Sequence, residues 1–156
     1  MKIKDFSPEA KRLRYHLKRS QGLLRAFAQG RDKEYPHRLM GHPDKVKWAL
    51  MHVQKALDNG VVLCEEERAD LLRQVGLTRM ELQRLRDSAT MQNLVERKER
   101  VEEAADNGEF VGLMGLLLVL FTPEDLERRE MELSLIQLAL SNTQDVDLES
   151  AILRTT

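Results

Sequence analysis

The amino-acid sequence predicts an all-α protein, a single compact bundle of about six to seven helices over residues 1–156. Hydrophobic residues make up 42% and charged residues 33% of the chain, which is typical of a folded, well-solvated protein. Aromatic residues are only 4%, so the core must use Leu, Val, Ala and Met, which favour helices over sheets. Apolar residues recur at helical spacing, and no segment alternates with the two-residue period of a half-buried strand.

The first two helices have clear start and stop signals. Ser7-Pro8-Glu9 is typical of an N-cap, a first-turn proline and a first-turn acid, and Gly30 ends the helix. Residues 30–43 hold two prolines and two glycines and are expected to form a loop. A second helix then runs from about Asp44 to the stop signal Asn59-Gly60.

Three shorter helices are expected in the middle of the chain. Gly76 ends the first of them, and the capping-box pair Thr78 and Glu81 begins the second. Asn107-Gly108 ends the third. The expected ranges are 65–75, 79–87 and about 89–108.

Residues 109–141 are expected to form an apolar helical hairpin that lies in the core or at an oligomer interface. Its first helix, 110–121, has 12 residues, whereas a membrane-spanning helix needs about 20. Its second helix begins at Thr122-Pro123. Residues 142–156 are polar and acidic and are expected to form a short tail with at most one short helix.

The cysteine content and the N-terminal residues predict a soluble protein of the cytoplasm without a membrane segment. Cys64 is the only cysteine, so no disulfide can form within the chain, and a reducing compartment suits it. The first residues lack the apolar stretch of a secretory signal.

Charge is distributed unevenly along the chain. Residues 1–60 carry 14 Lys and Arg against 6 Asp and Glu, residues 61–100 carry 8 of each, and residues 101–156 carry 3 against 12. A basic region at one end favours a polyanionic partner. The alternative is that the acidic third packs near the basic region of the same chain.

The segment 66–87 resembles a helix-turn-helix unit, with Gly76 at the turn. This unit and the helix that follows it make up the region 61–108. With its apolar residues facing inward, the second helix would present four polar side chains to DNA, where arginine can read guanine and glutamine adenine. These candidate residues are Arg79, Gln83, Arg84 and Arg86. Leu72 stands where such units normally have a small residue, so a plain helical corner is the alternative.

The basic N-terminal region supplies further candidates for nucleic-acid binding. Lysine and arginine release counterions from a phosphate backbone, and a tyrosine can stack on an unpaired base. The candidates are Lys11, Arg12, Arg14, Lys18, Arg19, Tyr35 and Arg38. The alternative interpretation is an ordinary solvated helix face.

No enzyme motif is present, and neither a cofactor nor a metal is expected. The chain has no glycine-rich phosphate loop, nucleophile elbow or metalloprotease motif. His37, His42 and His52 lack the spacing of a zinc site. Cys64 precedes three glutamates, whose negative charge opposes a thiolate.

The sequence therefore predicts a nucleic-acid-binding, most simply DNA-binding, regulatory protein without catalytic activity, which forms a homo-oligomer. The rival hypothesis is a helical protein–protein interaction module, such as an adaptor, assembly chaperone or inhibitor. That module would act through the apolar helices at 110–140 and the acidic C-terminal third.

Overall fold

The computed structural model describes residues 2–29, 42–88 and 121–155, with the backbone alone for residues 42 and 143–155. A short 3-10 turn, η1 (Ile3–Asp5), precedes four α-helices: α1 (Pro8–Ala28), α2 (His42–Asp58), α3 (Glu65–Arg86) and α6 (Pro123–Thr155). The described residues contain no strand, so the all-α prediction is confirmed. The helices expected over 89–108 and 110–121 lie outside the described residues.

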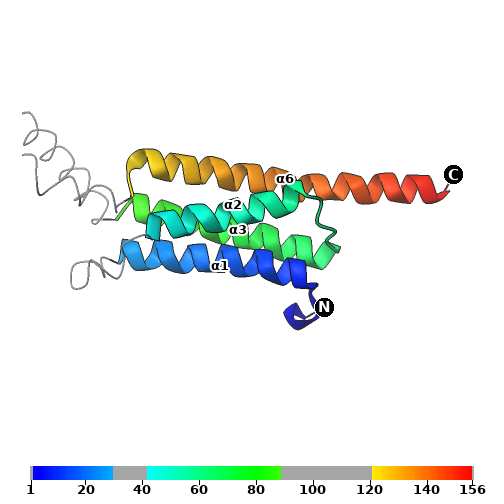
Figure 1. Cartoon of the computed structure of the whole chain (residues 1–156), viewed down its shortest axis with the longest axis horizontal. Helices are drawn as coiled ribbons and strands as arrows, with labels where there is room; N and C mark the ends of the chain where they lie inside the picture. Colours follow the sequence, from blue (N-terminus) through cyan, green and yellow to red (C-terminus); the bar gives the residue numbers. More distant parts are fainter. Residues whose placement is uncertain (1, 30–41, 89–120, 156) are drawn as a thin grey trace, which may run out of the picture.

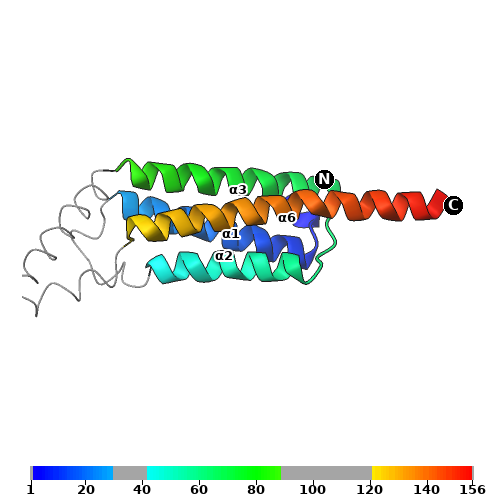
Figure 2. The same cartoon turned by 90° about the horizontal axis from the view of Figure 1, so that it is seen from above.

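The four helices lie side by side, with α1 and α6 diagonally opposite each other (Figures 1 and 2). Helix α1 packs against α2 and α3, and α6 packs against the same two helices. Chain direction alternates along the sequence, so α1 runs parallel to its neighbour α3, and α2 runs parallel to α6. Residues 59–64, which connect α2 to α3, therefore join diagonal corners of the bundle rather than neighbours.

Side-chain caps begin α1 and α6 as the sequence predicts. The Ser7 hydroxyl accepts a hydrogen bond from the backbone N–H of Ala10 at 3.2 Å, and Pro8 follows at the first helical position. Thr122 and Asp125 each accept a hydrogen bond from the other's backbone N–H at 3.1 Å. These bonds satisfy donors that a helix start otherwise leaves without partners.

The stop signal after α2 is also confirmed. The N–H of Gly60 donates to the carbonyl of Leu57 at 3.1 Å. Gly60 has φ +85°, a left-handed conformation that glycine adopts without steric cost.

The middle of the chain differs from the prediction, because α3 is one continuous helix. The separate helices over 65–75 and 79–87, and the helix-turn-helix unit at 66–87, are wrong. Glycine inside a helix costs only about 1 kcal/mol relative to alanine. Gly76 is exposed, and the burial of Leu71, Val75 and Leu82 on the opposite side of the helix offsets that cost.

The predicted capping-box pair has a different role in the folded chain. Thr78 is fully buried in the middle of α3, and its hydroxyl donates to the Gln74 carbonyl at 2.8 Å. The Glu81 carboxylate accepts hydrogen bonds from the guanidinium of Arg25 on α1, at 2.9 and 3.1 Å. Both residues therefore serve the contact between α3 and α1 rather than a helix start.

The described core consists mainly of leucine with some valine and alanine, as the composition predicts. The expected methionines are absent from it, because Met51, Met80 and Met131 are exposed. One aromatic pair lies at one end of the described core. Phe27 and Phe121 meet edge to face, with ring centroids 4.9 Å apart. Helix α6 has 33 residues and continues past position 141, where a tail is expected, so its C-terminal part extends beyond the bundle (Figure 1). No helix in the described ranges is both long and apolar enough to cross a membrane.

Candidate nucleic-acid interface

Two of the four residues predicted to read DNA connect α3 to α6. The Arg79 guanidinium donates to the side chains of Gln137 at 2.9 Å and Ser134 at 3.3 Å. Arg86 forms an ion pair with Glu130 at 2.5 Å. Both contacts join the C-terminal third to the charge-balanced region 61–100 rather than to the basic region 1–60.

The other two residues bond along α3 itself. The Gln83 amide donates to the Asp87 carboxylate at 3.1 Å, and Arg84 pairs with Glu81 at 3.2 Å. Helix α3 has α1 and α6 as neighbours and does not protrude as a recognition helix would (Figure 1). The structure therefore places the four residues on a packed helix and gives each of them a partner within the chain.

The predicted basic residues of α1 separate into two groups. Arg14 forms an ion pair with Asp70 of α3 at 3.0 Å and is mostly buried. The others are exposed and form no ion pair with any residue that the structure describes: Lys11, Arg12, Lys18 and Arg19. Tyr35 and Arg38 lie outside the described residues.

Helix α2 adds residues that the sequence analysis did not select. Lys45 and Lys55 are exposed, and no ion pair joins either of them to the described part of the chain. Trp48, the only tryptophan, is 57% exposed. Helical periodicity could have found it, because Trp48 lies outside the stripe formed by Val46, Ala49, Leu50 and Val53.

These exposed cations belong to two adjacent helices, and we call the outer side of α1 and α2 that carries them the basic face. It consists of Lys11, Arg12, Lys18 and Arg19 of α1 and Lys45 and Lys55 of α2. Exposed acidic residues on these two helices are fewer: Glu9, Asp44 and Asp58. Asp58 accepts a hydrogen bond from the Gln54 amide at 2.9 Å.

Aromatic rings connect α1 to α2 within the basic face. The Tyr15 ring meets His16 edge-on with centroids 5.5 Å apart. His16 stacks on His52 of α2, with centroids 5.1 Å apart and ring planes 16° from parallel. Trp48 precedes His52 by one helical turn and therefore lies on the same side of α2. We call Tyr15, His16, His52 and Trp48 the ring row.

The electrostatics of the ring row disfavour a charge on its central imidazole. Burial lowers the pKa of His16, and electrostatic interactions with His52, Arg19 and Arg12 lower it further. This shift favours the neutral form of the His16 imidazole. Arg12 and Arg19 lie four residues before and three residues after His16 on α1, so helical spacing places them beside the ring row.

No group of three or more His, Cys, Asp or Glu side chains in the described ranges is placed to hold a metal. His37 lies outside these ranges, and the side chain of His42 is not described. The backbone N–H of Glu67 lowers the pKa of the Cys64 thiol, but burial and the carboxylates of Glu67 and Glu66 raise it by more. The thiol therefore stays protonated and is a poor nucleophile.

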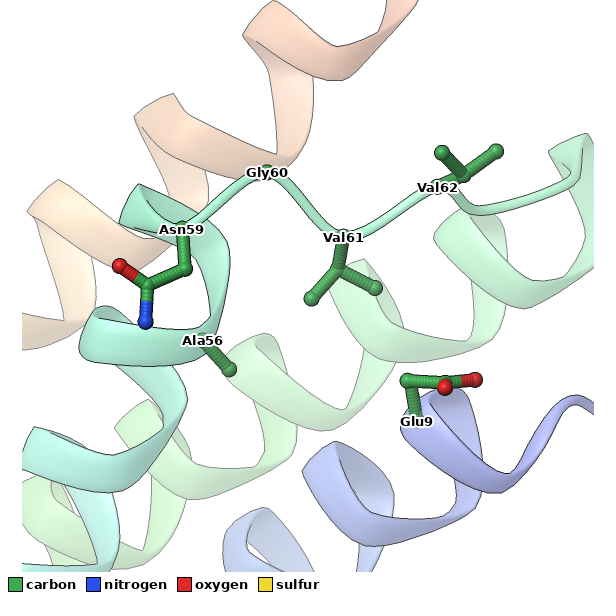
Figure 3. A pocket seen from close by; sticks show the side chains of 6 residues that line it. All are labelled: Glu9, Ala56, Asn59, Gly60, Val61 and Val62. Carbon is green, nitrogen blue, oxygen red and sulfur yellow. The ribbon is translucent and has the colours of Figure 1, made fainter.

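An open hollow of about 390 Å³ lies where α1 begins and α2 ends (Figure 3). Glu9 and Asn59 are its polar lining residues, and Ala56, Gly60, Val61 and Val62 complete it. Glu9 gives the hollow a negative charge, so it does not suit a phosphate. The basic face remains the better candidate for an anionic partner.

Comparisons with known proteins provide no relative. No protein-family model, no curated protein and no solved structure matches the chain.

Proposed function

We propose that this protein binds nucleic acid, and that it does so through the basic face on α1 and α2 rather than through α3. The observation that carries the proposal is the contrast between the two sets of cations. Four arginines of α3 have partners within the chain, namely Arg73, Arg79, Arg84 and Arg86. The six cations of the basic face are exposed and form no ion pair within the described residues.

Charge favours a polyanion as the partner of this surface. Six cations on two adjacent helices, with few acids between them, create a positive potential that attracts phosphates over roughly a Debye length, about 10 Å at 0.1 M salt. Lysine and arginine bind a phosphate backbone by releasing its counterions. Such binding depends strongly on salt and only weakly on sequence.

The test neutralises three of these cations together in the variant Arg12→Gln/Arg19→Gln/Lys55→Gln. Each phosphate contact on a single strand contributes about 0.7 to the slope of log affinity against log salt, so the slope should fall by about 2. That change corresponds to a roughly hundredfold loss of affinity at 0.1 M salt. Fluorescence anisotropy with labelled oligonucleotides at several salt concentrations measures both quantities.

A matched control removes three exposed cations from α3 and α6 in the variant Arg73→Gln/Arg84→Gln/Arg128→Gln. It changes the net charge by the same amount and should keep most of the affinity. If the control loses as much affinity as the test variant, overall charge rather than the basic face is responsible. If the control loses more affinity than the test variant, the result favours nucleic-acid binding through α3.

A specific observation favours a second candidate function, the protein–protein interaction module. Met131, Leu135 and Leu138 are 66%, 54% and 57% exposed and lie on one side of α6. Exposed apolar side chains on one helix face are typical of contact with another protein. Co-purification with a defined protein that survives nuclease treatment, without any oligonucleotide binding at low salt, would favour this candidate.

A further inference from the structure

The Phe, Tyr and Trp residues in the described part of the chain fall into two groups, one buried in the core and one exposed on the surface. Phe6, Phe27 and Phe121 are at most 6% exposed and belong to the core. Tyr15 and Trp48 are 58% and 57% exposed, and both belong to the ring row. Since tryptophan is strongly buried on average, a half-exposed tryptophan on a charged surface calls for an explanation other than folding.

The ring row has the features of a stacking platform. Ring contacts join Tyr15 and His16 of α1 to His52 of α2, and Trp48 lies one helical turn before His52 on the same side of α2. Neutral His16 adds no charge at its centre. Exposed aromatic faces of this kind stack with nucleobases of any sequence, because every base has a π-face.

Cations flank this platform along both helices. Arg12 and Arg19 lie about one turn before and one turn after His16, and both act electrostatically on its ring. Lys45 precedes Trp48 by three residues, and Lys55 follows His52 by three. Helical spacing therefore places positive charge on both sides of the rings. Stacking surfaces flanked by cations match a strand whose bases and phosphates are both accessible.

A base-paired duplex does not match this arrangement. Its bases stack on one another and expose only their edges in the grooves, so aromatic faces on a protein cannot reach them without unstacking. A recognition element must also enter a groove, whereas α1 and α2 lie side by side in the bundle (Figure 2). The rings would then contribute nothing to duplex binding.

We infer that the basic face holds single-stranded nucleic acid, with unpaired bases stacked on Trp48 and Tyr15 and phosphates held by Arg12 and Arg19. This inference rests on the proposed function and adds the class of ligand to it. Binding is expected to be nearly indifferent to sequence, because stacking and phosphate contacts carry it.

Trp48 makes the inference directly measurable, because it is the only tryptophan in the chain. A stacked base changes tryptophan emission, so an unlabelled thymidine oligomer of about 20 nucleotides, which covers the surface of a small domain, should quench the fluorescence of the full chain. The same oligomer should bind at least tenfold more tightly than a duplex of equal length, since only the single strand gains stacking.

The variant Trp48→Ala should bind the thymidine oligomer roughly ten- to a hundredfold more weakly, as expected for the loss of one stacked base. Its salt slope should be unchanged because no cation is removed. Trp48→Phe should recover much of the affinity. Met80→Ala removes a similarly exposed apolar side chain from α3 and should leave affinity unchanged. Circular dichroism should be the same for all variants, because neither side chain lies in the core.

Two results would overturn the inference in different ways. If the chain binds duplex and single strand equally, with constant Trp48 emission, it binds phosphates alone. The inference then fails while the proposed function stands. If neither oligonucleotide binds at about 20 mM salt, where phosphate contacts are strongest, both fail together.

Discussion

The bundle has two interfaces between parallel helices, which we call the α1–α3 seam and the α2–α6 seam. They differ in whether their buried polar groups have hydrogen-bond partners. Between α1 and α3, hydrogen bonds follow one another along the helices. They run from the Ser7 backbone N–H with the Glu67 carboxylate, through the side chains of Arg14 and Asp70, to those of Gln21 and Gln74. On α2 and α6, buried atoms of three polar side chains have no hydrogen-bond partner within the described chain: Oε1 of Gln54, Nε of Arg129 and Oε2 of Glu132.

Hydrogen-bonded pairs at heptad spacing fix the register of α1 on α3. Ser7, Arg14 and Gln21 are seven residues apart, so they return to the same side of α1 with each heptad. Sliding α1 along α3 by one turn would break every pair at once, because an unpaired buried polar group is costly. The α2–α6 seam lacks such a row of pairs and should tolerate changes in its polar residues better.

The largest expected effect comes from Glu67, at the start of the α1–α3 seam. Its carboxylate accepts hydrogen bonds from the backbone N–H groups of Ser7 at 2.7 Å and Cys64 at 2.9 Å, so it ties the starts of both helices together. Glu67→Ala should lower the free energy of unfolding by about 3 kcal/mol, since both bonds are charge-assisted. Urea denaturation measures this change, and Glu65→Ala, at an exposed neighbour, should have a much smaller effect.

The pH dependence of stability tests the role of Glu67 in a second way. Burial raises the pKa of Glu67, but the hydrogen bonds from Cys64 and Ser7 outweigh it and hold the pKa below its usual value. The unfolded chain therefore binds more protons below about pH 4.3, and the contribution of Glu67 to stability is lost as pH falls through its folded pKa. Wild type and Glu67→Ala should converge in stability under acid, and a constant difference would contradict this account.

A smaller loss is expected at the centre of the seam. The Gln21 amide donates to the side chains of Gln74 at 3.0 Å and Thr78 at 3.3 Å, and all three residues are buried. Gln21→Leu should cost about 2 kcal/mol, because it leaves buried acceptors without a donor. Gln21→Leu/Gln74→Leu should recover part of that loss, which a double-mutant cycle from thermal denaturation would measure. Additive losses would show that the two amides act independently.

The smallest effect, with the opposite sign, is expected at the α2–α6 seam. Burial raises the pKa of Glu132, and the opposing influence of Arg129, 2.7 Å away, does not outweigh it. Arg129→Met/Glu132→Leu should leave stability unchanged or raise it by about 1 kcal/mol, because apolar residues need no hydration. Glu132→Leu alone should destabilise by leaving the buried Arg129 charge without its partner. If the double variant loses as much as the single one, the two seams do not differ as we describe.

The sequence predicted the elements whose signals are local. Ser7 and Thr122 cap helices as expected, and Gly60 ends one, because these contacts join residues only three positions apart. The helix-turn-helix prediction failed because Thr78 and Glu81 find partners on α1, more than 50 positions away. No local pattern encodes such partners.

The candidate site was predictable in part for the same reason. Exposure of Arg12 and Arg19 followed from helical periodicity, whereas the pairing of Arg14 with Asp70 depends on which helix packs beside α1. Trp48 could have been found, since its position off the apolar stripe of α2 is visible in the sequence. The ring row could not, because it requires knowing that α1 and α2 bring His16 and His52 together.

The diagonal connection at residues 59–64 has a consequence for how the chain reaches this fold. Hydrogen bonds between α1 and α3 join residues 53 to 61 positions apart, so none of them can form within a simple helical hairpin. Loop closure over such distances slows folding relative to bundles built from successive hairpins. We therefore expect the α1–α3 contacts to form after α2 has packed back along α1, because they close longer loops.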